Sequence, residues 1–207
     1  MGEAKSGWRA FVILNLLAIA LAAMPVYFLV RTPSDILCLD LRAEKDDLSH
    51  FIIVNSRDGL MASHTWITWQ WNKPGVEAPT YQSFGFYANI VDRTQAVLHP
   101  PGEALNETEI FDKMRISGLQ LPDTRTAIVF YLDQASFDGS KEMLDSWQAG
   151  KVYDLFSRDC VSFVSELLVR LGLQVPARIF APTPHAFVRA VIEMNSDDSR
   201  VCKAEQK

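Results

Sequence analysis

The run YDLFSRDCVSFVSELLVRLGL, residues 153–173, combines a loop, a helix start and a cysteine. From Cys160 onward the apolar residues recur at the spacing of one helical face. Cys160 therefore stands in the first turn of a predicted helix over 159–171. Unpaired backbone N–H groups and the helix dipole favour a thiolate at this place, which suits a nucleophile. The same apolar face also suits a small buried core residue, so the pattern alone leaves both interpretations open.

The chain upstream of this helix is rich in alternating, aromatic and β-branched stretches that are typical of strands. The predicted strands are 35–42, 50–56, 61–71, 80–91 and 126–133, and the predicted helices are 135–149, 159–171 and 184–194. The segment 99–124 contains Pro100, Pro101 and Gly102 and is predicted to be mostly loop. Strands come first and helices follow, which predicts an α+β domain with an antiparallel sheet packed on helices.

The N-terminal segment is apolar and carries no charge from Phe11 to Val30. Twenty such residues form a helix about 30 Å long, enough to cross a bilayer core. We therefore predict a transmembrane anchor over 8–30 after a cytoplasmic N-terminus, 1–7. The alternative is a signal peptide that is cleaved after the small residues at 20–23. Both interpretations export the rest of the chain, and the anchor predicts a single-pass inner-membrane protein with a periplasmic domain.

Composition and charge indicate the class of protein and exclude one kind of partner. The chain of 207 residues is 48% hydrophobic and 22% charged, as a globular protein is. We predict a linker and first strand over 31–49, one domain over 50–194 and a polar, frayed tail over 195–207. The net charge of −5 and the scattered basic residues argue against a nucleic-acid partner.

The three cysteines are Cys38, Cys160 and Cys202. In an exported domain an odd count leaves one thiol unpaired or paired outside the chain. Because domain termini often lie close together, a Cys38–Cys202 disulfide that leaves Cys160 free is one possibility. The other is that Cys38 and Cys202 are small thiols without a structural role. No CxxC motif or Cys/His cluster is present, so neither a metal nor another cofactor is expected.

His64 is the histidine best suited to act as a base, because it lies on a predicted strand, 61–71. A thiolate–imidazole pair requires a ring that rigid elements hold within reach of the sulfur. A histidine on such a strand is nevertheless more often structural than catalytic. His50, His99 and His185 are predicted to be solvated loop or cap residues, although His185 also suits the lining of a substrate cleft.

Three short motifs together resemble circularly permuted NlpC/P60 proteins. They are SHTW at 63–66, YQSFGFY at 81–87 and YDLFSRDCVSFV at 153–164. In this papain-like branch the histidine precedes the cysteine, the reverse of the ordinary NlpC/P60 order, and the resemblance spans about 50–190. It implies a papain-like fold with Cys160 as nucleophile and His64 as base. It also implies that the backbone N–H of Cys160 donates to the oxyanion.

The resemblance further implies a third, orienting group on the strand after the base. The candidates on 80–91 are Gln82, Ser83 and Asn89. Ser83 is preferred because it shares a strand parity with Gly85 and Tyr87. Permuted members often have Asn before the cysteine, where this chain has Asp159, which suits either a role beside the oxyanion or the helix N-cap.

The expected function is that of a membrane-anchored, extracytoplasmic thiol hydrolase that cleaves amide bonds through Cys160 and His64. By resemblance the substrates are cell-wall peptides. One alternative keeps the same site but acts on lipid acyl groups, as a hydrolase or acyltransferase. The other is a catalytically inactive binding or scaffold module of an envelope complex. The expected partners are thus a peptide or acyl-containing envelope substrate and the membrane, through the N-terminal helix.

Overall fold

The computed structural model describes residues 35–43, 50–57, 63–73, 75–88, 101–109, 126–148, 151–155 and 157–202. The chain divides into two units, Met1–Pro33 and Ser34–Lys207, and every described residue belongs to the second. The predicted anchor or signal peptide, 8–30, and the segment 1–7 lie outside the described residues. Within the described ranges, no helix is both long and apolar enough to cross a membrane.

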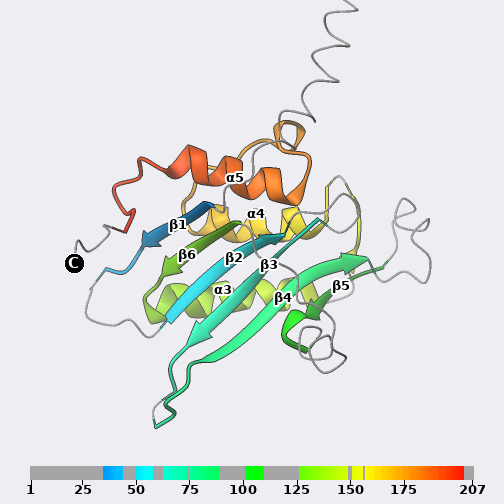
Figure 1. Ribbon diagram of the computed structural model, residues 1–207. Helices are drawn as coiled ribbons and strands as arrows, with labels where there is room; N and C mark the ends of the chain where they lie inside the picture. Colours follow the sequence, from blue (N-terminus) through cyan, green and yellow to red (C-terminus); the bar gives the residue numbers. More distant parts are fainter. Residues whose placement is uncertain are drawn as a thin grey trace, which may run out of the picture. The chain divides into compact units, whose positions relative to one another are not determined.

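The described strands form one seven-stranded sheet of order β1-β6-β2-β3-β4-β5-β7 (Figure 1). They are β1 Asp35–Asp40, β2 His50–Arg57, β3 His64–Trp71, β4 Thr80–Ala88, β5 Pro101–Asn106, β6 Thr126–Tyr131 and β7 Lys151–Val152. Together with the helices this confirms the α+β class. The sheet is mixed, because β1 pairs parallel with β6 while all other neighbours are antiparallel. The prediction of an antiparallel sheet is wrong at this edge, where β6 inserts between β1 and β2.

Strand β5 lies in the segment 99–124 that the sequence predicts to be mostly loop. Pro101 is its first residue, a place where a strand tolerates proline because no ladder hydrogen bond is lost there. Gly102 pairs with Ala88 and Asn106 with Phe84, so β5 runs along β4 over its whole length. Pairing with a distant strand therefore overrides the local proline and glycine signals.

Glu107–Glu109, directly after β5, are helical, and three further helices and a short 3-10 turn complete the described domain. They are α3 Gln134–Gln148, α4 Cys160–Arg170, η2 Arg178–Phe180 and α5 Pro184–Asn195. Helix α4 packs on β3 and β4, α3 on β2 and β5, and α5 on β1, β2 and β6.

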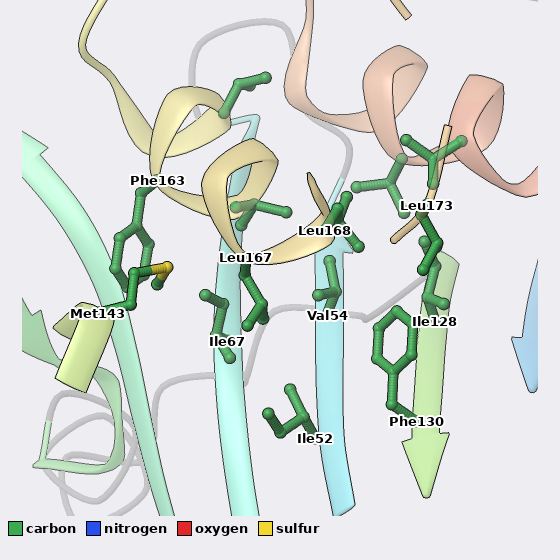
Figure 2. Close-up of a cluster of buried hydrophobic side chains, with 14 of the residues drawn as sticks. Ile52, Val54, Ile67, Ile128, Phe130, Met143, Phe163, Leu167, Leu168 and Leu173 are labelled. Atoms are coloured by element: carbon green, nitrogen blue, oxygen red, sulfur yellow. The ribbon is translucent and has the colours of Figure 1, made fainter. Parts of the chain in front are cut away.

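A single hydrophobic cluster joins these helices to the sheet. Figure 2 shows Phe163 and Leu167 of α4 in this cluster with Ile67 of β3 and Val54 of β2. Each of these four side chains is fully buried. The apolar face of α4 that follows Cys160 is thus its docking face, and it fixes the helix start against the strand that carries His64.

A disulfide joins Cys38 of β1 to Cys202 near the C-terminus, with the two Cα atoms 5.3 Å apart. The backbone N–H of Cys202 also donates to the carbonyl of Cys38 at 2.9 Å, and Val201 forms a bridge with Leu39. The disulfide that the sequence left open is therefore present, and Cys160 is the free cysteine. The prediction of a frayed tail from 195 is wrong as far as Cys202, because this segment pairs with the edge of β1.

Candidate active site

The start of α4 places Cys160 at the first helical position, directly after its N-cap. Asp159 is that N-cap, and its Oδ1 accepts from the Ser162 backbone N–H at 2.9 Å. Its other oxygen accepts from the Arg178 guanidinium at 2.5 Å. Asp159 is only 2% exposed, so the pair with Arg178 compensates the burial of its charge. The sequence left two roles open for Asp159, one beside the oxyanion and one as the helix N-cap, and the structure shows the N-cap.

His64 opens β3, and Cys160 lies close enough to its ring to raise the pKa of the imidazole. Both residues are 6% exposed. The Tyr87 ring lies 4.3 Å from the imidazole, centroid to centroid, and the Trp66 ring stacks at 6.1 Å. The structure thus brings together the cysteine and the histidine that the sequence singled out, although 96 residues separate them in the chain.

Glu107 is the residue that contacts the far side of the imidazole. Its Oε1 lies 2.9 Å from His64 Nε2, and its side chain is fully buried. Since Nε2 faces the carboxylate, Nδ1 is the ring nitrogen left for the sulfur of Cys160. A carboxylate in this position fixes both the tautomer and the orientation of the ring.

Tyr87 donates its phenolic O–H to the same Oε1 of Glu107. The other oxygen, Oε2, is buried and has no hydrogen-bond partner among the described residues. The carboxylate is therefore held through one oxygen by two donors, a phenol and an imidazole. A buried carboxylate with so few partners is costly, and such groups concentrate at functional sites.

The turn that carries Glu107 is fastened to the neighbouring strand. Asn106 Oδ1 accepts from the Thr108 backbone N–H at 3.0 Å, and Thr108 Oγ1 accepts from the Ser83 backbone N–H at 3.1 Å. The Ser83 hydroxyl lies 2.8 Å from Thr68 Oγ1. The prediction that Ser83 orients the imidazole is therefore wrong. Its backbone instead helps to hold the turn that presents Glu107.

Gly85 of β4 leaves the space in which His64 and Glu107 meet. A Cβ atom at this position would lie 2.4 Å from His64 Nε2 and 2.5 Å from Glu107 Oε1. Both distances are far below van der Waals contact. The glycine is required here by close approach, because any side chain would occupy the place of the hydrogen bond.

The buried partners of His64 control its charge. Burial alone lowers the pKa of His64, but the hydrogen bonds and charges of Cys160 and Glu107 outweigh it and raise the pKa from 6.5 to about 9. Burial and the Glu107 carboxylate also raise the pKa of the Tyr87 phenol. At neutral pH the ring is therefore an imidazolium, between a sulfur and a carboxylate, and Tyr87 remains a hydrogen-bond donor.

We expect the imidazole of His64 to titrate near pH 9 in the folded protein, which NMR of the ¹⁵N-labelled ring measures. Because the folded pKa lies above the ordinary value of 6.5, the imidazolium stabilises the fold fully below pH 6.5. That contribution is lost as the pH rises through about 9. In Glu107→Gln the pKa falls by about one pH unit or more, because the anionic partner is gone. Titration of the wild-type ring near 6.5 contradicts this description.

A pocket of about 590 Å³ opens over the nucleophile. It is lined by Ser63, Tyr153, Leu155, Asp159, Cys160, Arg178, Ile179, Pro182, Thr183 and Pro184. The helix start, the segment before α4 and the residues around η2 thus form its walls. A small electrophile entering this pocket reaches the sulfur.

His185 is buried at 5% exposure, so its prediction as a solvated loop or cap residue is wrong. It belongs to the first turn of α5, and its Nδ1 lies 3.3 Å from Thr126 Oγ1 of β6 and 3.5 Å from Ser56 Oγ of β2. It does not line the pocket at Cys160.

The described residues contain no cluster of His, Cys, Asp and Glu able to hold a metal ion.

The fold and the site define an α+β protein in which a strand histidine lies beside a helix-start cysteine and is hydrogen-bonded to a buried glutamate. Comparison with protein-family models, with curated proteins and with solved structures finds no match for this chain.

Proposed function

We propose that the protein is a papain-like thiol hydrolase in which Cys160 is the nucleophile, His64 the acid–base group and Glu107 the group that orients it. The observation that carries this proposal is the series from Cys160 through His64 to Glu107, buried at the start of α4 beside an open pocket. A core cysteine has no need of an imidazole–carboxylate partner. A nucleophile needs one.

The reaction follows from where the groups lie. The thiolate of Cys160 attacks the substrate carbonyl, a C–S bond forms, and the bond to the leaving amine or alcohol breaks. The imidazolium of His64 gives its proton to that leaving group. Water then attacks the thioester and gives a proton back to His64, and the C–S bond breaks to release the acid and restore the thiolate and the imidazolium. The backbone N–H of Cys160, at the start of α4, is suited to stabilise the oxyanion.

The order of the three groups along the chain supports the permuted NlpC/P60 interpretation. His64 comes first, on β3, Glu107 comes second, directly after β5, and Cys160 is last, at the start of α4. We assign Glu107 to the third position, for which the sequence offered Gln82, Ser83 and Asn89, with Ser83 preferred. By this resemblance, the proposed substrates are amides of envelope peptides, such as those of the cell wall.

The disulfide between Cys38 and Cys202 supports an extracytoplasmic location, because such bonds persist in oxidising compartments. With the apolar segment 8–30 as an anchor, the site would work at the outer face of the inner membrane. A membrane-tethered hydrolase of envelope substrates is the function that these features support best.

The direct test is alkylation of the full-length protein by iodoacetamide between pH 5.5 and 9. We expect Cys160 to react at pH 6 at least about 10-fold faster than a free thiol, because a neighbouring imidazole activates a nucleophilic cysteine. The disulfide leaves Cys160 as the thiol to be labelled. His64→Ala is the matched control and should restore the pH dependence of an ordinary thiol.

A folded protein whose Cys160 resists labelling, or reacts like a free thiol, contradicts the proposal and favours a binding or scaffold module.

The rate of hydrolysis of 4-nitrophenyl acetate gives a second test of the site. Glu107→Gln should lower kcat/KM by on the order of 10²-fold, because the ring loses its orienting partner. Unchanged kcat/KM in that variant would remove Glu107 from the site.

A further inference from the structure

A second pocket, the α4 pocket, has a volume of about 470 Å³ and lies along helix α4. Ser162, Ser165 and Val169 of α4 line it, together with Phe187 of α5. Arg178 lines both this pocket and the pocket at Cys160. The two pockets are therefore neighbours on the surface, and the side chain of Arg178 is a wall that they share.

The α4 pocket begins beside the nucleophile. Cys160 lines the first pocket, and the next two residues of the helix, Val161 and Ser162, line the second. From Ser162 to Val169 the helix rises about 10 Å. An extended peptide of about three residues covers the same length. A peptide whose reacting carbonyl lies at the sulfur can therefore continue through the α4 pocket.

Arg178 has hydrogen-bond donors left for a ligand where the two pockets meet. Its Nη1 donates to the Ala181 carbonyl, and its Nη2 donates to Asp159 Oδ2. Because a guanidinium carries five N–H groups, the others have no acceptor among the described residues. The side chain is 28% exposed, so a ligand that crosses between the pockets can reach these donors. A peptide carbonyl is an acceptor of the kind that they require.

The α4 pocket favours a neutral polar ligand, because its charges are already paired. Glu166 accepts from Arg170, and Arg178 donates to Asp159. The Trp147 indole also donates to Glu166 and so fixes the carboxylate. Further hydroxyl groups line the pocket, at Ser157, Ser162 and Ser165. An alkyl chain that displaced water would leave these groups without partners, whereas peptide N–H and C=O groups can pair with them.

We propose that the α4 pocket is a substrate subsite that holds about three residues of an extended peptide, on one side of the amide that Cys160 cleaves. The inference rests on the thiol-hydrolase function above and adds a binding site for its peptide substrates. Arg178 donates to a peptide carbonyl where the chain passes from one pocket to the other. Val161 and Phe187, each 1% exposed, form an apolar floor under the bound chain.

The test compares the rates at which reagents with and without a peptide alkylate Cys160 of the full-length protein. Iodoacetyl-Ser-Ala-Ser-amide carries the peptide by its N-terminus, and acetyl-Ser-Ala-Ser chloromethyl ketone carries it by its C-terminus, so both chain directions are tested. Iodoacetamide and chloroacetone are the respective references. At least one peptide reagent should react about 10-fold faster than its reference, a gain that one or two hydrogen bonds supply.

Two substitutions fill the α4 pocket without touching the nucleophile. Ser165→Trp places an indole in the pocket, and Val169→Trp does so from a position that is 56% exposed, where a larger side chain leaves the core intact. Each should remove most of the gain of the peptide reagent and leave the rate with iodoacetamide unchanged. Met194→Trp is the control, since Met194 is 44% exposed on α5 and lines neither pocket.

The outcomes separate this inference from the function on which it rests. If iodoacetamide reveals an activated Cys160 but neither peptide reagent gains over its reference, the subsite is overturned and the thiol hydrolase stands. The same conclusion follows if the gain survives both tryptophan substitutions. N-octyl iodoacetamide that gains as much as the peptide, and loses this gain in Val169→Trp, also overturns the subsite, because the pocket then binds apolar chains. A folded protein whose Cys160 resists iodoacetamide overturns both.

Discussion

Replacing Cys160 by alanine is expected to lower kcat/KM for any ester or amide substrate by about 10⁴-fold or more, because no other group can form the thioester. The free energy of unfolding should change by only about 1 kcal/mol or less. The substitution removes one sulfur atom from a helix start, and the imidazolium of His64 keeps its partner Glu107. Steady-state kinetics and urea unfolding of the full-length protein measure the two effects separately.

Cys160→Ser is the matched control for this prediction. Serine has nearly the size of cysteine and a hydroxyl that can also interact with His64, but this hydroxyl is a far weaker nucleophile in this setting. Both variants should therefore fold and both should be inactive. A loss of several kcal/mol of stability in Cys160→Ala, with activity retained in Cys160→Ser, would show instead that the sulfur is a packing atom.

The parts of the site that could be predicted from the sequence are those with a local signature. The helical period that begins at Cys160 marks both the helix start and the face that docks on β3. The alternation around His64 marks a strand, and a strand can place a ring against a helix start. These patterns depend on near neighbours in the chain, so a single sequence is enough to read them.

The third group had no such signature. Glu107 follows β5, a strand that exists because it pairs with β4 and that opens with a proline, so the local rules indicate a loop. The strand parity of Ser83, Gly85 and Tyr87 did indicate the correct surface. The parity did not show that Gly85 makes room for the contact between His64 and Glu107 by having no side chain. It also did not show that Tyr87 donates a hydrogen bond to the Glu107 carboxylate. The mixed edge of the sheet was missed for a similar reason, because parallel pairing of β1 with β6 is a contact between distant segments.

Gly85→Ala is expected to disable the site although it adds only one methyl group. The added Cβ would lie 2.4 Å from His64 Nε2 and 2.5 Å from Glu107 Oε1, so one of these two side chains has to move. Both are buried, which leaves little room for relaxation. A displacement of about 1 Å in a catalytic group lowers activity on the order of 10²-fold. Overpacking should also cost about 1–3 kcal/mol of stability.

Gly139→Ala is the control, because a Cβ at Gly139 in α3 has no atom within 4 Å. This variant should keep full activity and gain about 0.5–1 kcal/mol of stability from its helix propensity. In Gly85→Ala the pKa of His64 should also move from about 9 toward 6.5 as the carboxylate is displaced. A Gly85→Ala protein with wild-type kcat/KM and an unshifted imidazole would show that the His64–Glu107 contact plays no part in turnover. Loss of activity together with a lowered pKa ties catalysis to the carboxylate that the sequence did not reveal.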